Sequence, residues 1–142
     1  MSHVAERTGG CACGAVRLKT TGEPKRGGLC HCLTCRKAHA SAFNPFVVFA
    51  PQAVEVLGTT QAWLSSPGYV RRFCPECGSR VLAENSDGAG GREIELSSGS
   101  FDEIGLFSPQ YESWTVRREP WLDHLEAPQY DENRPALPEP AD

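Results

Sequence analysis

"GGCACGAVR", residues 9–17, and "FCPECGS", residues 73–79, are the two stretches that decide the fold of this chain. Each holds two cysteines beside glycine, and the four cysteines are Cys11, Cys13, Cys74 and Cys77. Glycine permits the tight turns, called knuckles, in which backbone N–H groups point at cysteine sulfurs. Four thiolates around one ion form the closed arrangement of a structural zinc site. The sequence therefore predicts a four-cysteine zinc site that ties the first strand to a late hairpin.

The segments between the cysteines indicate a mainly β, single-domain fold built from short antiparallel sheets. Runs that alternate apolar and polar residues, or that are apolar throughout, are separated by turns with glycine and proline. The expected strands cover residues 15–19, 46–50, 53–58, 69–73, 79–84 and 92–98. The last two are expected to form a hairpin around a glycine-rich loop at 85–91. One or two short helices are expected, starting at Ser100, which fits a capping box, and at Pro120.

Length, charge and hydropathy limit the classes of protein to which this chain can belong. The 142 residues suit one domain, expected over 1–126, followed by a proline-rich, acidic tail over 127–142. The net charge of −4 and the dispersed basic pairs argue against nucleic acid as a partner. The chain has no apolar run of membrane-spanning length, and its polar N-terminus lacks the apolar centre of a signal peptide. We therefore expect a soluble, cytoplasmic protein without a membrane partner, whose oligomeric state the sequence does not determine.

The stretch "LCHCLTCRK", residues 29–37, contributes the remaining three of the seven cysteines: Cys30, Cys32 and Cys35. In a reducing compartment such cysteines favour metal binding or thiol chemistry over disulfides. Three thiolates can hold a second zinc ion and leave its fourth position open, which distinguishes a catalytic zinc site from a structural one. Because the thiolates outweigh the charge of the dication, the site suits a thiol ligand better than a strongly acidic water. Arg36 and Lys37 follow directly and can offset the negative charge.

Three other interpretations of this three-cysteine group stay open. His39 can supply a fourth ligand and close the site if a helix follows Cys35, whereas His31 lies inside the group, where neighbouring residues usually point apart. The group could instead hold an iron–sulfur cluster with one open iron, although its spacing does not match the ferredoxin runs. Cys32 and Cys35 could also form a redox dithiol, although the βαβ context of thioredoxin-like motifs is missing.

Taken together, "GGCACGAVR", "CHCLTCRK" and "FCPECGS" resemble the glutathione-dependent formaldehyde-activating enzyme family, whose domain is shared with centromere protein V. The stretch "SPQYESWTVRREPWL", residues 108–122, is similar to the C-terminal segment of the family, so the resemblance runs from Gly9 to about Leu125. Two positions depart from the family pattern. His39 stands where members often have glycine, and Glu112 stands where they often have histidine.

The resemblance implies a β-tent fold with a structural zinc at the four-cysteine site and a catalytic zinc at the three-cysteine site. It also implies a zinc-dependent carbon–sulfur lyase-like enzyme acting on thiol adducts. The substrate would be a small thiol such as glutathione, joined to formaldehyde or another small carbonyl to give, in the named reaction, S-hydroxymethylglutathione. The alternative function is a non-catalytic module with two structural zinc sites that binds a protein partner or a thiol cargo.

The corresponding mechanism assigns roles to residues around the three-cysteine group. Cys30, Cys32 and Cys35 would carry the reaction, and His31 or His39 would carry the proton. A carboxylate of the substrate would be anchored by one of the nearby basic residues, which are Arg36, Lys37, Arg71 and Arg72. One of the three tryptophans could line the substrate cleft, and the sequence does not choose among Trp63, Trp114 and Trp121.

Overall fold

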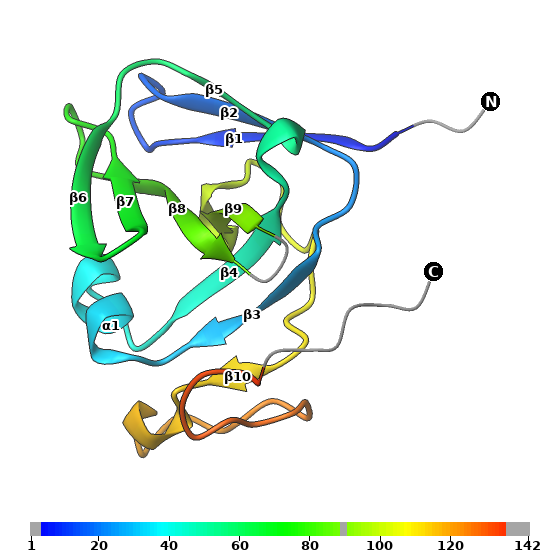
Figure 1. Ribbon diagram of the computed structural model, residues 1–142, viewed down its shortest axis with the longest axis vertical. Helices are drawn as coiled ribbons and strands as arrows, with labels where there is room; N and C mark the ends of the chain where they lie inside the picture. Colours follow the sequence, from blue (N-terminus) through cyan, green and yellow to red (C-terminus); the bar gives the residue numbers. More distant parts are fainter. Residues whose placement is uncertain (1–3, 89–90, 136–142) are drawn as a thin grey trace.

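Two β-sheets and one α-helix form most of the computed structural model, which describes residues 4–88 and 91–135 (Figure 1). The strands are β1 (Glu6–Gly10), β2 (Arg17–Thr21), β3 (Arg26–Cys30), β4 (Asn44–Phe49), β5 (Val54–Leu57), β6 (Gln61–Ser66), β7 (Tyr69–Phe73), β8 (Arg80–Gly88), β9 (Gly91–Ser97) and β10 (Glu112–Ser113). The helical segments are α1 (Leu33–His39) and the 3₁₀ turns η1 (Pro51–Ala53), η2 (Ser98–Ser100) and η3 (Thr115–Arg117). The predicted mainly β fold is confirmed.

The strands pair into a three-stranded sheet and a seven-stranded sheet. The order is β1-β2-β5 in the small sheet and β10-β3-β4-β9-β8-β7-β6 in the large one. All neighbours are antiparallel, as expected, except that β10 runs parallel to β3. In Figure 1 the small sheet lies across the top of the curled large sheet, and α1 follows the end of β3. The predicted hairpin is formed by β8 and β9, and residues 89–90 of its expected loop lie outside the described residues.

The large sheet has an apolar face because side chains alternate along each strand. Val47, Leu96 and Leu82 are cross-strand neighbours on this face and belong to the hydrophobic core. The core also contains Phe49 and Cys74, both fully buried. Complete burial of one such large apolar side chain stabilises the fold by about 1.5–3 kcal/mol. The core therefore lies between the two sheets and reaches the four-cysteine group.

The opposite face of the large sheet is mixed, because Phe46 and Val48 form a second, smaller apolar cluster with Tyr111 and polar side chains lie beside it. Glu95 on β9 lies opposite Ala83 on β8, which in turn lies opposite Arg71 on β7. Cys30 at the end of β3 lies opposite Asn44 on β4, on this same face. The three-cysteine group is thus positioned on the face opposite the main core, where Cys30 packs against the smaller apolar cluster.

The two helices expected near the C-terminus do not form. The Ser100 hydroxyl does not cap a helix, because it is directed at the backbone oxygens of Arg80 and Val81, at 3.3 and 3.4 Å, and Ser100 is the last residue of a 3₁₀ turn. Residues 120–126 form turns and bends, so the helix expected at Pro120 is wrong. Trp121 in this segment is 72% exposed, and a short helix that buries no apolar face gains too little to form. The single α-helix, α1, instead follows the three-cysteine stretch.

The described part of the expected tail, residues 127–135, runs beside β10 (Figure 1). The N–H of Glu112 donates to the Pro128 oxygen at 3.0 Å, and the N–H of Tyr130 donates back to the Glu112 oxygen at 2.9 Å. Residues 136–142 of the expected tail lie outside the described residues. Within 4–88 and 91–135, no helix combines the length and the apolar character that crossing a membrane requires.

Candidate metal centres and the cleft between them and solvent

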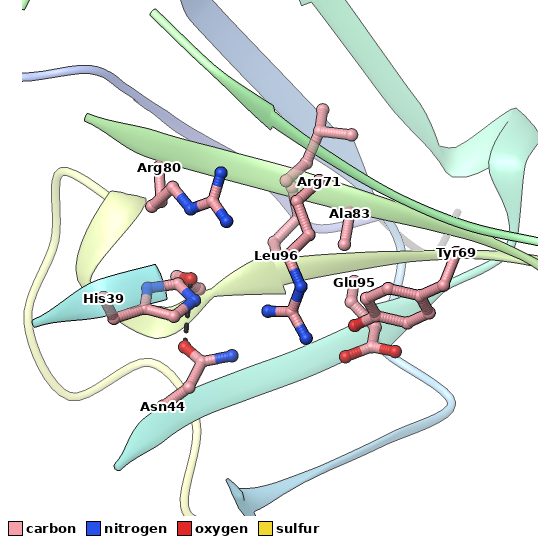
Figure 2. A pocket seen from close by; sticks show the side chains of 10 residues that line it. His39, Asn44, Tyr69, Arg71, Arg80, Ala83, Glu95 and Leu96 are labelled. Carbon is pink, nitrogen blue, oxygen red and sulfur yellow. Dashed lines mark hydrogen bonds between the residues drawn. The ribbon is translucent and has the colours of Figure 1, made fainter. Parts of the chain in front are cut away.

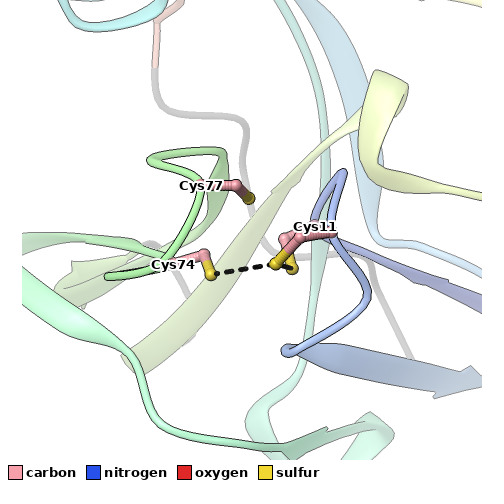
Figure 3. A group of neighbouring side chains, drawn as sticks. Cys11, Cys74 and Cys77 are labelled. Carbon is pink, nitrogen blue, oxygen red and sulfur yellow. Dashed lines mark hydrogen bonds between the residues drawn. The ribbon is translucent and has the colours of Figure 1, made fainter.

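The four-cysteine group brings two loops together. The sulfurs of Cys11, Cys13, Cys74 and Cys77 all lie within 4.8 Å of one another. The Cys11 and Cys13 sulfurs are 3.6 Å apart, and those of Cys13 and Cys74 are 3.8 Å apart. Tetrahedral zinc with Zn–S bonds of about 2.3 Å requires sulfurs about 3.8 Å apart. The β1–β2 and β7–β8 loops, which face each other in Figure 3, therefore fit one metal ion between them.

Backbone groups hold these sulfurs in place. The N–H of Val16 donates to Cys11 Sγ at 3.2 Å, and the N–H of Glu76 donates to Cys74 Sγ at 3.4 Å. Such bonds favour the thiolate form that a metal requires. Gly14 in the first loop has φ = 84°, a left-handed conformation that residues with a Cβ adopt only at a cost. The knuckle geometry predicted from the glycines is therefore present.

The second loop adds hydrogen bonds from a serine. The Ser79 hydroxyl lies 3.2 Å from Cys77 Sγ. Hydrogen bonds from the side chain and the backbone N–H of Ser79 lower the pKa of Cys77 to about 5. The Ser79 hydroxyl also accepts a bond from the N–H of Ala12 at 3.1 Å, which joins the two loops directly. Ser79 therefore stabilises the charged form of Cys77 and links the two loops that carry the four cysteines.

The three-cysteine group lies where β3 ends and α1 begins. The sulfurs of Cys30, Cys32 and Cys35 lie within 4.8 Å of one another. Cys32 is the N-cap of α1, and its sulfur accepts a hydrogen bond from the N–H of Cys35 at 3.3 Å. The hydrogen bonds of the Cys30 and Cys35 thiols lower the pKa of Cys32 to about 2. The turn from β3 into α1 thus brings the three sulfurs close together, where they can hold a metal ion.

A buried arginine lies against this group. Nη1 and Nη2 of Arg71 lie 3.8 and 3.7 Å from Cys35 Sγ, and its Nε donates to Ser65 Oγ at 3.1 Å. Arg71 is 7% exposed and Cys35 is 4% exposed. Three thiolates around a dication carry a net negative charge, and a guanidinium keeps its positive charge at any physiological pH. Arg71 is therefore placed to neutralise a metal centre with three thiolates.

The three-cysteine group opens into a cleft of about 640 Å³, whose wall is the mixed face of the large sheet. Tyr69, Arg71 and Glu95 line it, and the Arg71 guanidinium lies 4.9 Å from the centre of the Tyr69 ring. Burial raises the pKa of Glu95 and that of Tyr69. A carboxyl group with a raised pKa holds a proton more readily than an exposed one, so the cleft combines sulfur ligands with a group suited to proton transfer.

His39 does not join the three sulfurs. It lines a small cavity of about 10 Å³ with Asn44, Arg71 and Arg80 (Figure 2), a volume for about one water molecule. Burial, followed by the charges of Arg80 and Arg71, lowers the pKa of His39 to about 4, so the ring is neutral at pH 7. No ring nitrogen of a described histidine lies within 4.8 Å of all three sulfurs. The structure therefore does not bring His39 into place as a fourth ligand.

His31 lies in a buried polar cluster with β10. The residue is fully buried, its Nε2 lies 2.7 Å from Glu112 Oε1, and its ring packs on Phe43. Burial alone would raise the pKa of Glu112, but hydrogen bonds from Gln129, the N–H of Leu125 and His31 lower it below the ordinary value. His31 thus supports the strand beside the cysteines. For both histidines, the catalytic role stays a prediction.

Of the four basic residues considered as carboxylate anchors, Arg71 lines the cleft. Its neighbour Arg72 lies on the opposite face of the sheet, where its Nε donates to Glu84 Oε2 at 3.1 Å. Arg36 forms an ion pair with Glu119. Lys37 lines a separate pocket. The structure therefore separates Arg71 from its sequence neighbour Arg72, whereas Arg36 and Lys37 line the same pocket outside the cleft.

The sequence did not single out Tyr69, Glu95, Asn133 and Arg134, which line the cleft together with Trp114. For Glu95 the signal was the alternation of charged and apolar residues in "REIELSS", which indicates a strand with one polar face. Tyr69 shares a face with Arg71 for the same reason. No sequence signal pointed to residues 133 and 134, because they reach the cleft only when the tail folds back along β10.

The fold and the two cysteine centres define a mainly β, metal-binding protein. Residues 6–117 match the model of the family described as glutathione-dependent formaldehyde-activating enzyme, and the chain belongs to this family. It is 31% identical over 83 residues, 58% of its length, to an uncharacterized lyase from Schizosaccharomyces pombe, and spans about three-fifths (61%) of that relative. A crystal structure of a Rhodobacter sphaeroides protein has the same fold, with a TM-score of 0.56 and 16% identity over 70% of this chain and 91% of that one.

Proposed function

We propose that this protein is a zinc-dependent carbon–sulfur lyase-like enzyme. Its substrates would be adducts of a small thiol, such as glutathione, with formaldehyde or another small carbonyl. The observation that carries the proposal is the three-cysteine group at the wall of the cleft, with the Arg71 guanidinium on Cys35. The family and the lyase name of the yeast relative support it.

Zinc is the metal that we propose for both centres. Sets of three or four thiolates are typical zinc ligands, and the sulfur spacing at the four-cysteine group fits zinc–sulfur bonds. At the three-cysteine group, zinc would offer an open position to the substrate sulfur and lower the pKa of the substrate thiol. Arg71 would keep this region of the cleft from accumulating negative charge.

The residues of the cleft can complete the reaction. Glu95 would accept the thiol proton, and the thiolate sulfur would attack the carbonyl carbon, so that a C–S bond forms and the carbonyl π electrons move to oxygen. That oxygen would then take the proton back from Glu95, directly or through the neighbouring Tyr69 hydroxyl. In the lyase direction the same steps run in reverse: the hydroxyl proton leaves, the carbonyl re-forms and the C–S bond breaks.

Exchange NMR with glutathione and formaldehyde tests the proposal. The zinc-loaded protein should increase the rate at which formaldehyde hydrate and S-hydroxymethylglutathione interconvert above the spontaneous rate. Cys35→Ser should remain folded, lose one equivalent of zinc and lose the acceleration. Metal content and near-UV circular dichroism of the same samples provide the control. A wild-type protein that gives no acceleration would contradict the proposal.

The non-catalytic alternative makes a different prediction in the same experiment. A module with two structural zinc sites would bind glutathione or a partner without accelerating exchange, and Cys35→Ser would unfold it. The cleft and the cation beside the three sulfurs favour the enzyme, because a closed structural site needs neither.

A further inference from the structure

The family match ends at residue 117, yet later residues form part of the cleft. Asn133 and Arg134 line the same cleft as Cys30 and Cys32. They belong to a segment that we call the C-terminal strap, residues 125–135, which lies beside β10 in Figure 1. The part of the cleft nearest to the strap is therefore formed by residues outside the matched region.

A buried carboxylate fastens the start of the strap. Oε2 of Glu112, a residue that is 1% exposed, accepts hydrogen bonds from the N–H of Leu125 and from Gln129 Nε2, both at 2.8 Å. Its backbone forms the bridge to Gln129. Hydrogen bonds donated to a buried carboxylate are directional and costly to break, so they fix where the strap begins.

Trp114 fastens the other end. Its N–H donates to the Glu132 oxygen at 3.0 Å, and its Nε1 donates to Asn133 Oδ1 at 2.9 Å. Trp114 has φ = 57°, a left-handed conformation that is unusual for a residue with a Cβ and that occurs at functional sites when the surroundings enforce it. The strap supplies those surroundings. Arg134, the next residue, is thereby held in the cleft.

Arg134 has a charge that the described residues leave unpaired. Its guanidinium lies 5.6 Å from the centre of the Tyr111 ring, and its Nη1 is buried without a hydrogen-bond acceptor. Arg26, which also lines this part of the cleft, differs in that its charge is paired: its two terminal nitrogens each make a 2.8 Å bond to Glu93, although its Nε lacks an acceptor. A buried N–H without an acceptor is unfavourable, and a carboxylate is the strongest partner that a guanidinium can receive.

The position of Arg134 fits a ligand that also reaches the three sulfurs. Tyr111, on which Arg134 lies, packs against Gly28, where an added Cβ would come within 3.1 Å of the ring. Gly28 and Cys30 point to the same face of β3, and two residues of a strand span about 7 Å. A carboxylate at Arg134 and a sulfur at the three-cysteine group can therefore belong to one small peptide thiol.

We propose that Arg134 is a specificity-determining residue that binds a carboxylate of the thiol substrate, and that the C-terminal strap serves to hold it there. This inference rests on the proposed function for its choice of ligand. It predicts that thiols without a free carboxylate are poor ligands of this protein.

Calorimetric binding of glutathione and of its diethyl ester to the zinc-loaded full chain tests the proposal. The ester has nearly the same size but no free carboxylate. The wild-type protein should prefer glutathione by at least about tenfold, as expected for a charge-assisted pair. Arg134→Gln should remove most of this preference, and Arg134→Lys, which keeps the charge but not the planar fork, should keep part of it. In turnover, Arg134→Gln should raise KM for glutathione with little change in kcat.

Arg117→Gln is the matched control, because Arg117 is an exposed arginine at the same end of the molecule and does not line the cleft. A wild-type protein without a preference for glutathione over the ester would overturn the inference, and so would an Arg134→Gln protein that keeps the preference. If Arg134→Gln does not fold, an Arg134→Lys protein with the full wild-type preference and KM overturns the inference, and one with a reduced preference supports it. If the wild-type protein does not accelerate exchange but Arg134→Gln still loses the preference for glutathione, the proposed function fails and the carboxylate site stands.

Discussion

The four-cysteine group and the three-cysteine group use the same ligand atom in opposite surroundings. Cys11 and Cys74 of the first group belong to the hydrophobic core between the two sheets, and backbone N–H groups hold their sulfurs. The second group lies on the opposite face of the large sheet, where a side chain, Arg71, approaches Cys35 and a cleft of about 640 Å³ lies in front. The two groups therefore differ both in the number of cysteine ligands and in the side of the large sheet on which they lie.

This difference is the one expected if a structural centre and a reactive centre share one fold, as we propose. Four ligands embedded in the core would fill the coordination of a zinc ion and contribute to folding. Three ligands on the opposite face would contribute less to folding, and an open fourth position beside the Arg71 charge would suit thiol chemistry.

The largest effect is expected for Cys74→Ser. Cys74 is fully buried, and structural zinc sites contribute binding free energy to folding on the order of 10 kcal/mol. We expect this variant to lose cooperative folding, whereas Cys32→Ser, at the edge of the cleft, should lower the free energy of unfolding by only about 1–2 kcal/mol. Urea titration followed by circular dichroism measures both. Equal losses in the two variants would show that the two centres do not differ in their structural role.

Glu112→Gln should lower the free energy of unfolding at pH 7 by about 2–3 kcal/mol, because it weakens the bonds to His31, Leu125 and Gln129. The pKa of Glu112 lies below its ordinary value in the folded protein. Its contribution is therefore present above the ordinary glutamate pKa of about 4.3 and is lost as the pH falls through the folded pKa. Urea titrations at several pH values should show that the difference between wild type and variant shrinks in acid.

Glu119→Gln is the control for that comparison. Glu119 pairs with Arg36 near the surface, and such pairs contribute about 0–1 kcal/mol. A loss in Glu119→Gln as large as in Glu112→Gln would mean that the buried cluster beneath the three-cysteine group has no special role.

Arg71→Gln should reduce kcat/KM in the proposed reaction by about 10–100-fold, because it removes the positive charge beside Cys35. Arg72→Gln provides a matched control, since its side chain lies on the opposite face of the same strand and pairs with Glu84. Exchange NMR and the zinc content of both variants give the comparison. If the two variants lose activity equally, the position of the Arg71 guanidinium beside Cys35 has no particular role in the reaction.

The smallest effect is expected for Gly14→Ala in the first knuckle. The space around Gly14 is open, so only its left-handed backbone opposes a side chain, at a cost of about 1–2 kcal/mol. Gly99→Ala has equally open surroundings without the left-handed conformation and should change stability by less than about 0.5 kcal/mol. Thermal unfolding of the zinc-loaded variants measures the difference. Equal stability would show that the knuckle does not depend on the glycine.

The sequence predicted those parts of the molecule that depend on local spacing. The grouping of Cys11 and Cys13 with Cys74 and Cys77 follows from knuckle spacing and glycine, and the structure brings those sulfurs together. The strand Tyr69–Phe73 was predicted with its observed bounds, because its β-forming residues end at turn signals. The helix at Pro120 was predicted wrongly, since local capping signals do not show whether an apolar face will be buried.

What the sequence by itself determined is the mainly β class and the division of seven cysteines into four and three. Strand patterns and the spacing within each cysteine pair or triplet are local, and the ligand number of a zinc ion then groups the two pairs. Only the tertiary structure decided what surrounds the three. Arg71 and Glu95 meet because three strands pair in one register, and Arg134 reaches the cleft because Glu112 and Trp114 hold the strap. Contacts between residues that are far apart in sequence depend on strand register and on buried polar partners, and neither can be inferred from local spacing.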